Sequence, residues 1–329
     1  MPAKLLLNLL TELKKYFIPI FLFTLFISSC KKEEVTLLTQ EVDGHTTHQL
    51  HDVLFVNDSV GYICGGEKWD IGIFMRTTDG GKTWSVPDSI FNACAYSMQF
   101  FSPEHGIVSG NVSDWAYTVD SGKTFSASQS DYVAINQFAF INQQVGVRVG
   151  GDGYATGYIT STQNGGNTWN KITLPNNMMA VRYTDSNTVF ASGYGVIYKS
   201  TDAGVTFNPL DVRGDFFMAM DFPTPQVGYF AGYEGLILKT TDGGNSFKRI
   251  RRGNEPFGHR VHWETIKFWN ENIGYVAGDN GELLKTENGG DDWKTVKSFT
   301  SANLRDIHFF SAASGIIVGD NGKIFLFTQ

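Results

Sequence analysis

The stretch TTDGGKTW, residues 77–84, is a short polar turn that ends in a tryptophan, and close copies of it return along the chain. The copies are TVDSGKTF at 118–125, TQNGGNTW at 162–169, STDAGVTF at 200–207, TTDGGNSF at 240–247 and TENGGDDW at 286–293. The glycine in fifth position recurs at intervals of 38 to 46 residues. One module is therefore about 40 residues long, the length of a supersecondary repeat.

Each part of this eight-residue box has a structural reason. The Asp or Asn in third position can accept hydrogen bonds from backbone N–H groups of the turn. The glycine two residues later adopts a positive φ without steric cost, and the closing Trp or Phe is expected to pack in the apolar layer between modules. The residues in third and last position are Asp79 and Trp84, Asp120 and Phe125, Asn164 and Trp169, Asp202 and Phe207, Asp242 and Phe247, and Asn288 and Trp293. We interpret the box as a structural turn.

The remainder of each module consists of short apolar segments. A Gly-led strand such as GYICGG at 61–66 or GVRVGG at 146–151 is followed by a strand such as GLILKT at 235–240, which runs into the box. Segments of this length, separated by regular turns and without a helical pattern, indicate an all-β protein. Four strands in about 40 residues are typical of a propeller blade.

The two ends of the chain predict how the ring closes. A seventh module begins at NLRDIHFF, 303–310, and stops after GKIFLFTQ, 322–329, so it has three strands and no box. The segment EVTLLTQEV at 34–42 is a lone strand without a blade. Placing it as the fourth strand of the last blade removes two open sheet edges. We predict a seven-bladed propeller over 45–329, preceded by a signal peptide over 1–30 and a tether with the closing strand over 31–44.

The first thirty residues have the features of an export signal. Lys14 and Lys15 precede an apolar run over 16–27 that is too short for a comfortable membrane span. The run ends in ISSC at 27–30, which resembles a bacterial lipobox, and KKEE at 31–34 resembles the surface-export signal of Bacteroidota lipoproteins. We expect lipidation at Cys30 and attachment to the cell envelope, at the outer membrane or cell surface. The alternative is an ordinary signal peptide.

Composition excludes some classes of function. The formal net charge of −7 argues against a nucleic-acid surface, which would normally be basic. Besides Cys30 the chain has Cys64 and Cys94, which either pair in an oxidising compartment or are buried thiols, the outcome we expect. His45, His48 and His51 could be ligands, but His45 and His48 would lie on opposite faces of a strand and no cysteine or carboxylate pair joins the three, so we expect neither a metal nor a cofactor.

The propeller geometry predicts where a partner would bind. The boxes occupy one face of the ring, so the loops between the second and third strands, and those between blades, lie on the other. Aromatic residues in such loops tend to anchor interfaces, although DNG segments are also good turn formers and the aromatics can be packing residues. The candidate binding residues are Glu67, Trp69, Asp70, Asp114, Trp115, Tyr154, Tyr194, Tyr233, Glu234, His259 and His262.

A basic stretch in the connection from blade 5 to blade 6 is a second candidate surface. It consists of Lys248, Arg249, Arg251 and Arg252, with Arg260 nearby. In a strand Arg249 and Arg251 share one face, and Lys248 and Arg252 share the other. The alternative, which we favour, is a solvated charged edge.

The box resembles the Asp-box, or bacterial neuraminidase repeat, Ser/Thr-x-Asp-x-Gly-x-Thr-Trp/Phe. Asn164 and Asn288 depart from it in third position, and Ser246 and Asp292 in seventh. With the VGYFAGYEGLILKTTDGG arrangement at 227–244, the chain is similar over roughly 45–329 to the photosystem II assembly/stability factor family. The resemblance implies a single exported seven-bladed propeller that binds a photosystem II subunit if the source is photosynthetic, and an arginine-rich contact patch.

We therefore expect a non-catalytic, membrane-anchored monomer that binds another envelope or membrane protein. The alternative is a sialidase-like glycoside hydrolase acting on extracellular glycans, since sialidases share the box. Such an enzyme needs three arginines around the substrate carboxylate, a Tyr–Glu nucleophile pair and an acid/base Asp. No arginine of the chain stands in a recognisable context of that kind.

Overall fold

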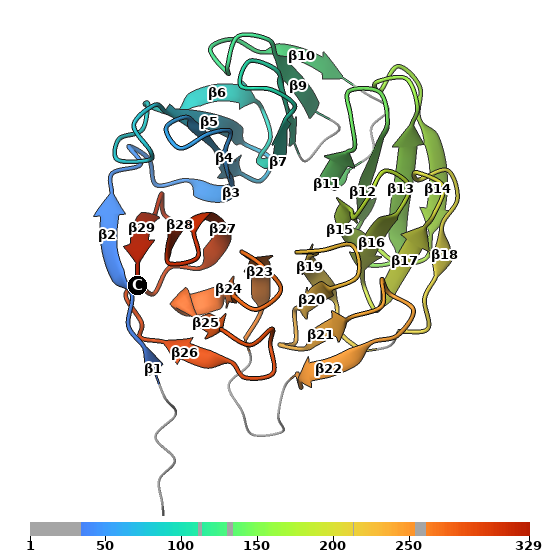
Figure 1. The fold of residues 1–329 in the computed structure, drawn as a ribbon. Helices are drawn as coiled ribbons and strands as arrows, with labels where there is room; N and C mark the ends of the chain where they lie inside the picture. Colours follow the sequence, from blue (N-terminus) through green and yellow to red (C-terminus); the bar gives the residue numbers. More distant parts are fainter. Residues whose placement is uncertain (1–33, 111–113, 130–133, 213, 254–260) are drawn as a thin grey trace, which may run out of the picture. The chain divides into compact units, whose positions relative to one another are not determined.

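The computed structural model describes residues 34–329 apart from 111–113, 130–133, 213 and 254–260. The part from Glu33 to Gln329 is one compact unit. Figure 1 shows its strands grouped into seven sheets, each a blade of a ring around a central opening. No helix among the described residues has the length and apolar character needed to cross a bilayer. The predicted all-β, seven-bladed propeller is confirmed.

Blades 1 to 6 each contain four consecutive strands, and blade 7 contains three strands and a fourth from the N-terminus. The strands of blades 1 to 3 are β3 (Gln49–Phe55), β4 (Gly61–Glu67), β5 (Ile71–Thr77), β6 (Asp88–Phe91), β7 (Ala95–Phe100), β8 (Gly106–Gly110), β9 (Asp114–Thr118), β10 (Ser126–Gln129), β11 (Ile135–Phe140), β12 (Gly146–Asp152), β13 (Thr156–Thr162) and β14 (Asn170–Leu174). Those of blades 4 and 5 are β15 (Met178–Tyr183), β16 (Val189–Gly193), β17 (Val196–Ser200), β18 (Asn208–Pro209), β19 (Phe217–Asp221), β20 (Gly228–Gly232), β21 (Ile237–Thr240) and β22 (Lys248–Arg251). Blade 6 has β23 (Trp263–Phe268), β24 (Gly274–Gly278), the 3-10 turn η2 (Asp279–Gly281), β25 (Leu283–Thr286) and β26 (Lys294–Val296), and blade 7 has β27 (Leu304–Ser311), β28 (Ser314–Gly319) and β29 (Ile324–Thr328).

The N-terminal segment closes the ring as the sequence predicts. Strand β2 (Leu38–Val42) pairs antiparallel with β29, so that blade 7 has the order β2-β29-β28-β27. A short preceding strand, β1 (Glu34–Val35), pairs parallel with β26 and adds a fifth strand to blade 6. This second pairing was not predicted. It joins blades 6 and 7 along their outer edges, next to the C-terminus in Figure 1.

The six boxes follow the third strand of their blades, and their aromatic residues pack against the preceding blade. Trp84 lies edge-on to Phe55, with ring centroids 6.0 Å apart, in a buried cluster that includes Ile316 and Ile324 of blade 7. Phe125 of blade 2 packs edge-on against Phe74 of blade 1 at 4.7 Å. The box therefore closes the apolar layer between blades, where large aromatic area stabilises most.

Hydrogen bonds within each box fix the turn. In the first box the Thr77 hydroxyl donates to Asp79 Oδ1 (2.8 Å) and accepts from the N–H of Gly81 (3.1 Å), and the Thr83 hydroxyl donates to Asp79 Oδ2 (2.7 Å). The sixth box departs from the pattern at both of the linked positions. There Asn288 Nδ2 donates to Asp292 Oδ2 (2.9 Å), so the roles of donor and acceptor are exchanged and the bond is kept.

The box carboxylates are expected to make stability sensitive to acid. Hydrogen bonds lower the pKa of Asp79, Asp120, Asp202 and Asp242 from 3.8 to about 2. The largest cause is a hydroxyl donor, which is the seventh residue of the box in three cases and Ser200 for Asp202. N–H groups of the turn lower the pKa further. In the unfolded chain these carboxylates take up protons near pH 4, so this contribution is present above about pH 4 and is lost as pH falls toward 2. Replacing all four by Asn should remove most of the fall in melting temperature between pH 4 and 2. The variant should still fold, because Asn164 already accepts the N–H of Thr168 in the third box.

Thermal melts from pH 2 to 7 check this expectation against a control variant, Asp58→Asn with Asp88→Asn, which changes two exposed carboxylates outside the boxes. An acid profile that is the same in the four-site variant and the wild type would contradict it.

Candidate functional site

The central cavity is lined by the innermost strand of every blade, and each of these strands has the same irregularity. The pairing of the first strand with the second skips one residue near its start in all seven blades, which is a β-bulge. A bulge turns the extra side chain away from the regular alternation. The seven bulged residues, His51, Tyr96, Asn136, Met179, Met218, Glu264 and Arg305, all line a cavity of about 590 Å³.

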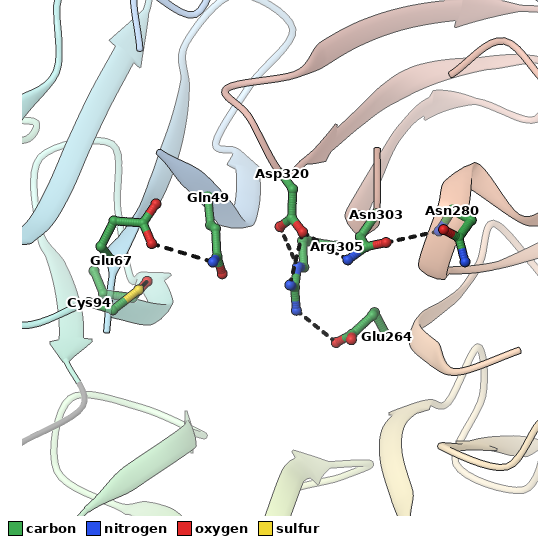
Figure 2. Close-up of polar contacts among 9 residues, drawn as sticks. Gln49, Glu67, Cys94, Glu264, Asn280, Asn303, Arg305 and Asp320 are labelled. Atoms are coloured by element: carbon green, nitrogen blue, oxygen red, sulfur yellow. Dashed lines mark hydrogen bonds and ion pairs between the residues drawn. The ribbon is translucent and has the colours of Figure 1, made fainter. Parts of the chain in front are cut away.

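One side of this bulge ring carries charges that neutralise each other. Arg305 Nη1 lies 3.2 Å from Glu264 Oε2, and Arg305 Nε donates to Asp320 Oδ1 at 2.8 Å (Figure 2). Burial acts to lower the pKa of Arg305, but the two carboxylates outweigh it and raise that pKa. Asn303 Nδ2 holds the second oxygen of Asp320 (2.9 Å), and Asn303 Oδ1 accepts from the N–H of Asn280 (2.9 Å). The guanidinium is thus committed to a network joining blades 6 and 7.

A second set of polar side chains lies next to the bulges and joins neighbouring blades. Side-chain oxygens of one inner strand accept backbone N–H groups of the next blade. The pairs are Met98 N–H to Asp52 (2.8 Å), Phe140 N–H to Gln99 (2.9 Å), Val181 N–H to Gln137 (2.7 Å), Phe268 N–H to Asp221 (2.7 Å) and Val53 N–H to Asp306 (3.2 Å). These bonds fix the spacing of the blades around the cavity.

A continuous series of aromatic rings, which we call the aromatic row, begins at the cavity, where Tyr154 and Tyr194 line it. It runs from Tyr154 to Tyr194 (ring centroids 5.1 Å apart), to Phe216 (4.3 Å), to Tyr233 (6.2 Å) and to His262, which stacks on Tyr233 at 3.6 Å. The five residues come from loops of blades 3 to 6. Tyr154 is 73% exposed and Tyr233 is 40% exposed. Exposed rings supported by their neighbours are suited to anchor a partner.

The row includes four of the predicted face residues, and others lie near the cavity or beside it. Trp69 is 65% exposed in the loop between β4 and β5, where Lys68 Nζ lies 5.5 Å from its ring centroid, and it lines the same cavity. Glu67 accepts from Gln49 Nε2 at 3.4 Å (Figure 2). Asp70 and Glu234 are exposed beside Trp69 and Tyr233 in sequence.

The expectation for Trp115 is wrong. Strand β9 already begins at Asp114, so Trp115 lies inside a strand and not in the preceding loop. Its ring packs on Phe138 (5.0 Å) and lies edge-on to Trp169 (6.1 Å), between blades 2 and 3. The side chain of Asp114, and all of His259, lie outside the described residues, as does Cys30.

Residues of the basic stretch form contacts within the protein that the sequence alone did not indicate. Arg251 Nη1 donates to the carbonyl of Gly235 (2.6 Å), and its guanidinium lies over the ring of Trp263 at 5.1 Å. Lys248 Nζ is 3.7 Å from Asp291. Arg249 also interacts within the protein, Arg252 is exposed, and Arg260 lies outside the described residues. Of the described residues of the stretch, Arg251 is therefore held within the blade, and Arg252 is exposed.

Two features of the site were not selected from the sequence. The bulged residues, apart from His51 as a possible metal ligand, and the blade-joining carboxylates Asp52 and Asp306 were not candidates, although HD at 51–52 and RD at 305–306 occupy matching places in their modules. Aligning the modules on the Gly-led strand would have placed these two pairs, and Glu264 of blade 6, at equivalent positions. Cys64 and Cys94 are both buried and free, and no group of three metal-ligating side chains exists within the described part of the chain.

Comparisons with known proteins place this geometry in a family context. Residues 206–298 and 258–328 match the family model described as "Photosynthesis system II assembly factor YCF48". A structure of YCF48 bound to D1 peptide aligns with a TM-score of 0.69 at 19% identity, covering 89% of this chain and 95% of that chain. YCF48 from Cyanidioschyzon merolae aligns at 0.68 and 18% identity, covering 88% and 98%. An ancestral GH74 enzyme aligns at 0.63 and 14% identity, covering 87% of this chain and 45% of that one.

The comparison with curated proteins gave no match. Solved structures at these identities show the fold, and the family match adds sequence evidence over the last three blades. The chain is therefore a seven-bladed Asp-box propeller that resembles the photosystem II assembly factor family, as its sequence predicted.

Proposed function

We propose that this propeller is a non-catalytic scaffold that binds a segment of a membrane or envelope protein along its aromatic row. The observation that carries the proposal is the unbroken series of ring contacts in the aromatic row, which starts from Tyr154 and Tyr194 at the cavity. Rigid exposed aromatics concentrate binding energy, since they lose little side-chain freedom on contact.

The comparison with solved structures supports this proposal. A propeller of the same fold is described as bound to D1 peptide, which is a precedent for peptide binding by such a ring. The partner of the present chain is a photosystem II subunit if its source is photosynthetic, and another envelope protein otherwise. We propose that the propeller acts as a monomer.

The arrangement of arginines supports the scaffold over the sialidase-like alternative. A carboxylate-gripping triad needs three guanidinium groups that converge on one point. Arg305 is held by Glu264 and Asp320, and Arg182 Nη2 lies 2.9 Å from Asp221. Arg148 is buried under the ring of Trp169, 4.0 Å from its centroid. We propose that the protein turns over no glycan.

We expect the double substitution Tyr154→Ser with Tyr233→Ser to abolish partner capture. Each exposed anchor contributes about 1–3 kcal/mol, so the pair should weaken binding by about a hundredfold or more. The measurement is capture of proteins from detergent-solubilised membranes on the immobilised full-length chain, followed by mass spectrometry. The melting temperature should fall only slightly, because Tyr154 is 73% exposed and Tyr233, which stacks on His262, is still 40% exposed.

The matched control is Tyr117→Ser with Val119→Ser, which removes two exposed apolar side chains at the box end of blade 2. If the Tyr154 and Tyr233 variant still captured the partner and the control did not, the assignment of the binding face to the aromatic row would be wrong. Hydrolysis of a fluorogenic sialoside that disappears with an arginine substitution would overturn the non-catalytic proposal.

We also propose that the chain is exported and anchored by a lipid on Cys30. The support is the apolar run at 16–27 meeting ISSC at 27–30. Labelled palmitate should enter the wild type and not Cys30→Ala, while Cys94→Ala, which changes a buried thiol, should label normally. Equal labelling of the wild type and Cys30→Ala would refute the anchor.

A further inference from the structure

The aromatic row is held in place before any partner arrives. The N–H of Tyr194 donates to the carbonyl of Asn177 (3.0 Å), and Tyr194 forms an isolated antiparallel bridge with Phe216. The N–H of Tyr233 donates to the carbonyl of Phe216 (2.8 Å). Because backbone bonds between successive loops fix the rings, binding along the row orders little of the protein.

The contacts of the row describe the shape of its ligand. The rings follow one another through loops of four successive blades, each touching the next, and the bulged residues Met179 and Met218 line the cavity on the same blades. A ligand that uses the whole row must therefore be extended across several blades. An extended peptide segment meets this requirement, and a small compact molecule does not.

Several carboxylates lie along the row, and one guanidinium reaches it, since Arg251 Nη1 donates to the carbonyl of Gly235 (2.6 Å). The loops that join the second and third strands of blades 3 to 6, together with the last residue of β12, contain four carboxylates and neither lysine nor arginine. The carboxylates are Asp152, Glu234, Asp279 and Glu282. Asp279 Oδ2 is 2.7 Å from His262 Nδ1, so that carboxylate is engaged, whereas the side chains of Asp152 and Glu234 are exposed. Below the row, the buried carboxylate of Asp215 accepts the N–H of Glu234 at 2.7 Å.

Aromatic faces bordered by carboxylates attract cations for two reasons. The ring quadrupole draws an ammonium or guanidinium group over its face, and nearby carboxylates add Coulomb attraction. The protein shows the first kind of contact elsewhere, since Lys171 Nζ lies 3.7 Å from the ring centroid of Tyr158. The exposed residues Asp152 and Glu234 are near neighbours in sequence of Tyr154 and Tyr233.

We propose that the aromatic row binds an extended segment of the partner that bears lysine or arginine side chains. Their cationic heads lie over Tyr154 and Tyr233 and pair with Asp152 and Glu234, and their aliphatic stems cover the rings. This inference rests on the proposed function, because it names the chemistry of the segment bound at the same row.

The test uses three fluorescent twelve-residue peptides with one Ser/Pro/Ala framework and four variable positions, filled with Lys, Gln or Glu. Fluorescence anisotropy with the full-length chain in detergent should give tightest binding for the Lys peptide and weakest for the Glu peptide. Asp152→Asn with Glu234→Gln should weaken Lys-peptide binding by about fivefold to tenfold and leave the Gln peptide unchanged. The control Asp58→Asn with Asp88→Asn removes two exposed carboxylates away from the row and should change nothing.

The outcomes separate the inference from the proposed function. Equal binding of the three peptides, lost in Tyr154→Ser with Tyr233→Ser, would keep the row as the binding site and overturn the cationic segment. A preference for the Glu peptide, no binding of the Lys peptide, or an unchanged preference in the Asp152 and Glu234 variant would also overturn it. If the Lys peptide bound Tyr154→Ser with Tyr233→Ser as tightly as the wild type, the aromatic row would not be the binding site, and both proposals would be wrong.

Discussion

Trp84→Ala is expected to lower the free energy of unfolding by about 3–5 kcal/mol, the usual cost of truncating a large buried aromatic. Trp84 is 5% exposed, and its cluster contains residues of blades 1 and 7, including Met75 and Ile316. Its indole N–H has no hydrogen-bond partner within the described residues, so packing alone holds the ring. The loss falls on the interface where the first blade meets the last, which completes the ring.

Chemical denaturation of the full-length chain measures this loss, with Trp69→Ala as the matched control. Trp69 is the same residue type in the same blade but is 65% exposed, so its truncation should change stability by no more than about 0.5 kcal/mol. Equal losses in the two variants, or a loss below about 1 kcal/mol for Trp84→Ala, would mean that the box aromatic does not hold the blades together.

The architecture was predictable because the box marks one corner of each blade. Six copies of that turn set the length of the module, and the incomplete module at 303–329 required a strand from elsewhere. The lone segment at 34–42 supplied it, and β2 pairs with β29 accordingly. These arguments depend on turn chemistry, which is local in the sequence, and on the rule that open strand edges need a partner.

The candidate site was only partly predictable because bulges break the alternation of side chains. A two-residue period assigns inward and outward positions, but the extra residue in each inner strand shifts every assignment after it by one. Glu264 and Arg305 therefore line the cavity without standing out in the sequence. The prediction for Trp115 was wrong for a related reason, since the start of β9 decides whether the ring lies in a loop or between blades.

Asp306→Ala is expected to lower the free energy of unfolding by about 3–5 kcal/mol, because it removes a buried carboxylate that pairs with the partly exposed Lys267 and accepts two hydrogen bonds. Asp306 lies 3.2 Å from Lys267 Nζ, accepts the Thr265 hydroxyl (3.0 Å) and accepts the N–H of Val53 (3.2 Å). It thus joins blades 6, 7 and 1. Its removal leaves an ammonium and an amide N–H without these acceptors, and an unsatisfied buried polar group adds its own cost. Equilibrium denaturation at pH 7 is the measurement.

Asp52→Asn is the matched comparison, because it changes the neighbouring carboxyl group and keeps an oxygen for the N–H of Met98. Burial and then the charge of Asp306 raise the pKa of Asp52 from 3.8 to about 8. The folded protein therefore holds a proton there that the unfolded chain releases near pH 4, and this group makes stability fall as pH rises from about 4 to 8. Asp52→Asn should remove that decline and match or exceed the wild type at pH 8, whereas Asp306→Ala should be less stable throughout. If Asp52→Asn lowered the free energy of unfolding as much as Asp306→Ala, the folded protein would need both groups as ionised carboxylates, and the expected difference between them would be wrong.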